Sequence, residues 1–98
     1  MDLDAVKTML LSHEAELKNE GIASLSVFGS VARREATGLS DVDLLSDFDG
    51  NRRLTAFDKA GLELRISDIL HTPVELCYRR LIKDDVRIRA EREAVFVF

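Results

Sequence analysis

Three short apolar segments alternate with helical patterns along this 98-residue chain, and the alternation limits the folds that it can adopt. Each segment has the length of a strand and lies between turn-forming residues. The stretches around the segments repeat apolar residues at helical spacing. The predicted elements are strands at 24–28, 41–46 and 74–78 and helices at 4–19, 31–35, 54–70 and 81–93. This order predicts a small α/β sandwich in which helices cover a sheet of three or four strands.

The composition is that of one compact globular domain covering residues 1–98. Hydrophobic residues make up 46% of the chain and charged residues 33%, a balance that argues against disorder. The start is acidic and no apolar run approaches the roughly 20 residues that span a bilayer, so a cytoplasmic location is expected. The single cysteine, Cys77, excludes an intramolecular disulfide and a Cys-rich zinc site. The net charge of −4 gives no reason to expect strong nucleic-acid binding.

A Gly-Ser pair follows the first apolar segment directly. Gly29 and Ser30 come after the run 25–28, so a strand is expected to end where a short helix begins. The first backbone N–H groups of a helix have no partner within the helix and can bind phosphate. Arg33 lies one helical turn beyond Ser30 and offers a planar set of donors. The segment is therefore a candidate phosphate-binding turn.

Two aspartates with a spacing of two follow this turn. If Asp41 and Asp43 lie in a strand, their carboxylates share one face, and the apolar side chains between and after them share the other. Like charges on one face repel by roughly 0.2–1 kcal/mol unless a cation lies between them. Mg²⁺ prefers such oxygen ligands. Glu75 is the candidate third ligand, because it is polar within an apolar strand and can face the same side.

Each candidate residue also has an ordinary structural interpretation. Gly29 and Ser30 alone fit a simple strand-to-helix turn, and two acids can make a strand edge polar. Arg33 can pair with Glu35 or Asp41, and a glutamate on a half-exposed strand is usually solvated. The spacing between the turn and the aspartates favours the functional interpretation, because each half of the pattern is weak alone.

A family resemblance is carried by residues 28–33, FGSVAR, and 40–45, SDVDLL. The combination resembles the signature of the minimal nucleotidyltransferases of the DNA polymerase β superfamily, which is Gly-Ser, then Arg, then Ser-Asp-x-Asp. The resemblance implies a small polymerase-β-like α+β fold with a mixed sheet, and a nucleotidyl transfer that uses two Mg²⁺ ions. The implied catalytic metal ligands are Asp41, Asp43 and Glu75, and the implied nucleotide-binding residues are Gly29, Ser30, Arg33 and Ser40. The third acidic position of the family is commonly aspartate, whereas this chain has Glu75.

The resemblance also implies a biological role. Proteins of this size and type are commonly antitoxins encoded beside a HEPN-domain RNase toxin, which they silence by transferring AMP from ATP to a toxin tyrosine. The implied substrate is therefore ATP, and the implied partner is a HEPN-type toxin in a hetero-oligomer.

Two other functions compete with this role. The chain can neutralise a partner by contact alone, as a non-catalytic binding module. Glu75 motivates this alternative, as does the apolar tail at 94–98, which is either a docked end or a partner surface. Nucleotide transfer to a small molecule such as an aminoglycoside is less favoured, because enzymes of that type usually carry a further domain for the acceptor.

Overall fold

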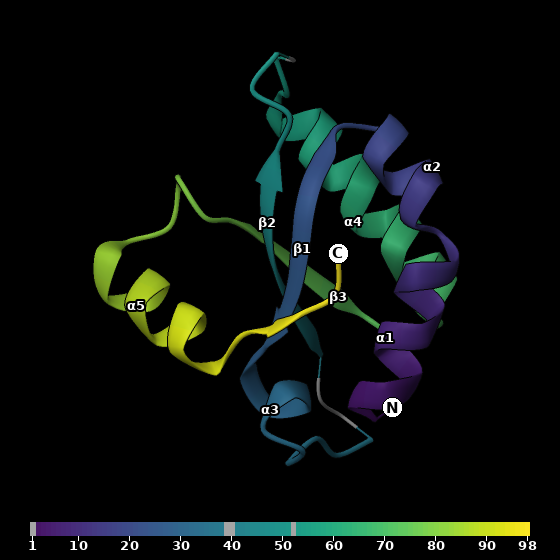
Figure 1. The fold of residues 1–98 in the computed structure, drawn as a ribbon, viewed down its shortest axis with the longest axis vertical. Helices are drawn as coiled ribbons and strands as arrows, with labels where there is room; N and C mark the ends of the chain where they lie inside the picture. Colours follow the sequence, from purple (N-terminus) through teal and green to yellow (C-terminus); the bar gives the residue numbers. More distant parts are fainter. Residues whose placement is uncertain (1, 39–40, 52) are drawn as a thin grey trace.

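The fold is a mixed four-stranded sheet with helices packed on it (Figure 1). The computed structural model describes residues 2–38, 41–51 and 53–98. Its elements in chain order are α1 (Leu3–Ser12), α2 (Glu14–Asn19), β1 (Ile22–Phe28), α3 (Gly29–Ala32), β2 (Val42–Phe48), α4 (Ala56–Leu70), β3 (Val74–Tyr78), α5 (Asp84–Glu93) and β4 (Val95–Phe96). The strand order is β3-β2-β1-β4, with β2 and β3 parallel and β1 antiparallel to both of its neighbours. The predicted α+β fold with a mixed sheet is confirmed.

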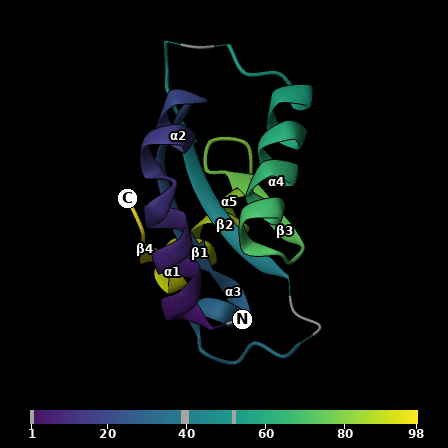
Figure 2. The same cartoon turned by 90° about the vertical axis from the view of Figure 1, so that its right-hand side faces the viewer.

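Helices α1, α2 and α4 cover one face of the sheet, and α5 lies on the opposite side (Figures 1 and 2). Alternate strand residues point toward the three helices, and Val27 of β1, Leu44 of β2 and Leu76 of β3 are fully buried there. They share one hydrophobic core with apolar side chains of α1, α2 and α4. Because side chains alternate along a strand, the remaining strand residues belong to the α5 side.

The first helical stretch is broken, where the sequence predicts a single helix over 4–19. His13 has φ −113° and ψ 16°, and its N–H donates to the Leu10 carbonyl oxygen at 3.0 Å, which ends α1. Helix α2 begins at the next residue and contributes Leu17 to the core. The prediction of helix is confirmed on both sides of the break, but the prediction of one continuous helix is wrong. Apolar periodicity does not show a local change in backbone angles.

Two further helix boundaries differ from the prediction. Helix α3 spans Gly29–Ala32 rather than 31–35, so the Gly-Ser pair belongs to the helix itself. Helix α5 begins at Asp84 rather than near residue 81. The extended backbone of Lys83 precedes it, and two acidic residues in its first turn favour a helix start there.

The start of α4 is set by a reciprocal cap. The Thr55 hydroxyl oxygen accepts from the Asp58 N–H at 3.2 Å, and the Asp58 carboxylate accepts from the Thr55 N–H at 2.8 Å. These bonds satisfy N–H groups that the helix leaves unpaired at its first turn. The helix therefore begins at Ala56, two residues after the predicted position.

The apolar tail is a docked end. Strand β4 pairs with β1, and beyond it the Val97 N–H donates to the Leu25 carbonyl oxygen at 2.9 Å. Val97 and Phe98 are buried, whereas Phe96 exposes 66% of its surface. The sequence allowed either a docked end or a partner surface. The structure shows docking for Val95, Val97 and Phe98 and leaves Phe96 exposed.

Within the part of the chain that the structure describes, no helix combines the length and the apolar character needed to cross a membrane.

Candidate active site

Two acidic residues of neighbouring strands lie side by side on the α5 side of the sheet. In the parallel pairing of β2 with β3, Asp43 is in register with Glu75. On its other side Asp43 is in register with Phe28, the last residue of β1. The neighbours of these acids along their strands, Leu44 and Leu76, enter the core beneath the three helices. The predicted orientation away from the apolar face is therefore confirmed for Asp43 and Glu75.

The two carboxylates interact directly. The pKa of Asp43 is raised above its ordinary value, first by partial burial and then by the negative charges of Glu75 and Asp41. A hydrogen bond between the Asp43 and Glu75 side chains raises this pKa further, while the charge of Arg33 lowers it. A group of negative charges that is only partly compensated favours a proton or a cation between its members.

Asp41 lies just before β2 and is exposed, so the predicted strand start at residue 41 is one residue too early. Its charge nevertheless acts on Asp43. Among the residues that the structure describes, no three acidic, histidine or cysteine side chains come together closely enough to form a complete metal-binding group. The donor set of Asp43 and Glu75, with Asp41 beside them, consists of carboxylate oxygens. It fits Mg²⁺, which is commonly held by one or two carboxylates together with water and substrate phosphates.

Gly29 lets the Asp43 carboxylate approach the turn between β1 and α3. Its φ of +74° is a left-handed conformation that side chains other than glycine rarely adopt. A Cβ atom at this position would lie 3.1 Å from Asp43 Cγ and would collide with a carboxylate oxygen. From the sequence, the strand-to-helix turn is a sufficient reason for a glycine at this position. The close approach of Asp43 to Gly29 is seen only in the folded structure.

Arg33 forms two ion pairs at the C-terminal end of α3. Its Nε donates to Glu35 Oε2 at 3.1 Å, and its Nη1 donates to Glu93 Oε2 at 3.0 Å. The hydrogen bond that Arg33 donates to Glu35 and the interactions with Glu93 raise the pKa of Arg33 above its ordinary value. The pairing with Glu35 matches the ordinary interpretation of Arg33.

Two residues, Ser40 and Glu93, are not covered by both the prediction and the structure. Ser40, which the resemblance places at the nucleotide, lies outside the described residues. Glu93 was missed by the sequence analysis, although its carboxylate also accepts from the Gly29 N–H at 3.3 Å. A glutamate at the end of a charged helix carries no sequence signal of a site, and only the pairing of β4 with β1 brings Glu93 to the turn.

The pKa of Cys77 is affected by the charges on this face of the sheet. Burial raises the pKa of its thiol to about 11, and the charges of Glu75 and Asp43 raise it as well. The thiol therefore stays protonated at neutral pH and has little nucleophilic character. The electrostatic environment around the acidic pair is negative, as a cation site requires.

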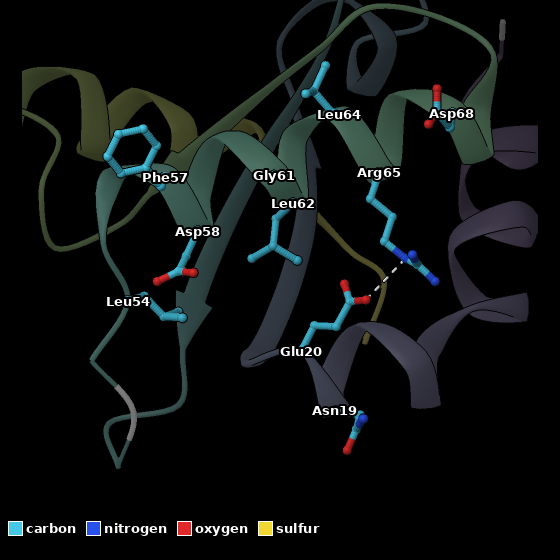
Figure 3. A pocket seen from close by; sticks show the side chains of 10 residues that line it. All are labelled: Asn19, Glu20, Leu54, Phe57, Asp58, Gly61, Leu62, Leu64, Arg65 and Asp68. Carbon is cyan, nitrogen blue, oxygen red and sulfur yellow. Dashed lines mark ion pairs between the residues drawn. The ribbon is translucent and has the colours of Figure 1, made fainter.

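A cavity lies elsewhere, over α4 and the end of α2 (Figure 3). It has a volume of about 660 Å³ and contains an ion pair between Arg65 and Glu20 with an N–O distance of 3.2 Å. Its lining residues are Asn19, Glu20, Leu54, Phe57, Asp58, Gly61, Leu62, Leu64, Arg65 and Asp68. None of the sequence-predicted site residues belongs to this lining, so the chemistry is assigned to the acidic pair and the Gly-Ser turn.

The raised pKa of Asp43 predicts how stability depends on pH in the absence of divalent cations. Because the folded chain holds this proton more tightly than the unfolded chain, the stabilising contribution is fully present below the ordinary pKa of 3.8. It is lost as the pH rises through the folded value. We expect the stability of the natural protein relative to Asp43→Asn to fall as the pH rises above about 3.8 and through the raised pKa of the folded protein. Urea unfolding of both proteins across this range measures the difference, and a constant difference would contradict the raised pKa.

Known proteins resemble this chain over nearly its whole length. The family described as a nucleotidyltransferase domain matches residues 11–97. The protein adenylyltransferase MntA of Thermococcus cleftensis is 33% identical over 98 residues, covering 99% of this chain and 97% of that protein. A proposed protein adenylyltransferase of Methanocaldococcus jannaschii, MJ0126, is 31% identical over 97 residues, covering 97% of each.

Solved structures show the same fold. A structure described as a minimal nucleotidyltransferase has a TM-score of 0.81 at 34% identity, covering 97% of this chain and 95% of that one. A chain from the complex of a tri-AMPylated Shewanella oneidensis HEPN toxin with an MNT antitoxin has a TM-score of 0.69 at 13% identity. That match covers 94% of this chain and 71% of the other, and it compares the fold alone.

Proposed function

This chain belongs to the nucleotidyltransferase family of enzymes, and we propose that it is a Mg²⁺-dependent protein adenylyltransferase. In the proposed reaction it transfers AMP from ATP to a tyrosine hydroxyl of a HEPN-type toxin and so acts as the antitoxin of that protein. The observation that carries the proposal is the approach of the Asp43 and Glu75 carboxylates to each other beside the Gly29 turn.

The acidic residues have the proposed role of metal ligands. Asp41, Asp43 and Glu75 would hold Mg²⁺, which neutralises the charge that develops on the transferred phosphoryl group. The raised pKa of Asp43 supports this role, because a cation would remove the repulsion that now favours its protonated form. Glu75 is exposed, so an acceptor from another protein can reach it.

The turn has the proposed role of holding the triphosphate. The backbone N–H groups of Gly29 and Ser30, the Ser30 hydroxyl and the Arg33 guanidinium are the donors assigned to the phosphate oxygens. Ser40 joins them on the strength of the family pattern. Gly29 supports the assignment because it allows the turn to lie directly against Asp43, so that phosphate donors and metal ligands are neighbours.

The proposed chemistry is an in-line displacement. The tyrosine oxygen forms a bond to the α-phosphorus of ATP while the bond from that phosphorus to the bridging oxygen of the β-phosphate breaks, and pyrophosphate leaves. Glu75 is the residue that we assign to accept the hydroxyl proton, because it is the exposed member of the acidic pair. Holding the two reactants in line supplies much of the rate in such reactions.

The proposed partner is suggested by the name of a relative and by the complexes in which this fold occurs. The relative in Thermococcus cleftensis is named a protein adenylyltransferase, and structures with this fold occur in complexes of HEPN toxins with MNT antitoxins. The apolar tail was one reason to consider an antitoxin that acts by contact alone. That reason is weakened, because Val97 and Phe98 of the tail are buried in the core. Catalysis therefore remains the better supported function.

An AMP-transfer assay tests the proposal. When the protein is incubated with Mg²⁺, ATP labelled at the α-phosphate and the HEPN protein encoded beside it, we expect the label on the HEPN protein. ATP labelled at the γ-phosphate should leave it unlabelled, because pyrophosphate is released. A HEPN protein whose acceptor tyrosine is replaced by phenylalanine is the matched control. Transfer that persists in EDTA, or in the double variant Asp41→Asn/Asp43→Asn, would exclude this mechanism.

A further inference from the structure

The Gly29 amide and the Arg33 guanidinium already bind an anion that belongs to the protein. Glu93 Oε2 accepts from the Gly29 N–H at 3.3 Å and from Arg33 Nη1 at 3.0 Å. The Nε of the same guanidinium donates to Glu35 at 3.1 Å. Two of the donors that the proposed function assigns to nucleotide phosphate are therefore occupied by one carboxylate oxygen.

The position of Glu93 follows from the sheet. In the antiparallel pairing of β1 with β4, Ser26 is in register with Phe96, and Val27 with Val95. Glu93 comes two residues before Val95, and Gly29 comes two residues after Val27, so the pairing brings the end of α5 close to the turn. The Glu93 side chain exposes 22% of its surface, whereas the Glu35 side chain exposes 65%. The pairing of β4 with β1 thus keeps Glu93 near the turn, and its side chain is partly open to solvent.

The negative charge of Glu93 does not stabilise helix α5 itself. Glu93 is the last residue of α5, where the helix dipole disfavours an anion. The contacts of its carboxylate with Gly29 and Arg33 compensate for this cost. They are also the contacts that a phosphate oxygen would make.

We propose that Glu93 competes with the triphosphate for the turn and so lowers the affinity of the free enzyme for ATP. A phosphate oxygen and the Glu93 oxygen cannot share one position, and two anions held close together repel each other. ATP must therefore displace the Glu93 side chain before it binds Gly29 and Arg33. This inference rests on the proposed function of the turn and adds a residue that sets nucleotide affinity.

Calorimetric titration of the full chain with Mg²⁺ and ATP tests the competition. Glu93→Gln keeps the shape of the side chain but removes the charge, so ATP should bind about three- to tenfold more tightly than it binds the natural protein. Glu93→Ala removes the acceptor as well and should tighten binding at least as much. Adenosine, which has no phosphate, should bind all of these proteins equally.

Glu91→Gln is the matched control. Glu91 lies on the same helix and pairs with Arg79 at 2.8 Å, away from the turn, so its change should leave ATP affinity the same. Weaker or unchanged ATP binding by both Glu93 variants would overturn the competition. Weaker binding would instead show that Glu93 holds Arg33 in place for the nucleotide.

Arg33→Gln tests the premise separately. If it weakens ATP binding while the Glu93 variants do not strengthen it, the phosphate-binding turn stands and only the competition is overturned. If ATP binds none of the proteins, or binds Arg33→Gln as well as the natural protein, the proposed role of the turn fails and the competition is overturned with it.

Discussion

Asp43→Asn should abolish AMP transfer while leaving the protein as stable as before, or more stable. The substitution keeps the size of the side chain but removes the charge that binds a cation. Loss of a metal ligand costs several kcal/mol of transition-state stabilisation, so the rate should fall by roughly 10³-fold or more. The folded state no longer has to bury this charge or bear its repulsion from Glu75 and Asp41, the effects that raise the pKa of Asp43, so its stability should not fall. Initial rates of AMP transfer and urea unfolding without Mg²⁺ measure the two effects.

Asp47→Asn is the matched control for this variant. Asp47 lies on the same strand and the same side as Asp43, and it accepts from the Ser24 hydroxyl at 3.0 Å and from Arg79 Nε at 3.1 Å. Its removal should lower stability by about 0.2–1 kcal/mol, the usual worth of a partly exposed ion pair, and leave the rate of transfer nearly unchanged. Equal losses of activity in the two variants would indicate that any negative charge on this face suffices, contrary to the assignment of Asp43 as a ligand.

Gly29→Ala should damage both the fold and the site. A side chain at a φ of +74° costs about 1–2 kcal/mol, and the new Cβ atom would displace the Asp43 carboxylate that lies against the turn. Since misplacing a catalytic group by about 1 Å can cost 10²-fold in rate, AMP transfer should fall by about that factor. Thermal unfolding and the transfer assay, performed below the melting temperature of the variant, separate the two losses.

Gly61→Ala provides the comparison within the same chain. Gly61 lies inside α4, and a Cβ atom there would meet nothing within 4 Å. Alanine should therefore raise stability by about 0.5–1 kcal/mol through the lower conformational entropy of the unfolded chain, and activity should not change. Full activity of a folded Gly29→Ala protein would show that the close approach of Asp43 to the turn is not needed for transfer.

Local patterns predicted most of the secondary structure because each depends on neighbouring residues. The apolar strand Val74–Tyr78 was predicted with the bounds that the structure shows, and the first strand was too short by two residues. The orientation of Asp43 followed from the period of two alone. Helix boundaries were less accurate, because a break such as that at His13 depends on backbone angles that periodicity does not contain.

Apart from the break at His13, the sequence by itself determined the order of the elements as far as α5, the Gly-Ser turn and the side of its strand to which Asp43 points. These features follow from residue type and spacing within a few positions. Only the tertiary structure decided that Glu75 is in register with Asp43, that Gly29 lies against the Asp43 carboxylate, and that Glu93 reaches the turn. Each of these contacts depends on which strands pair and in which register, and pairing is set by packing across the whole sheet rather than by neighbours along the chain.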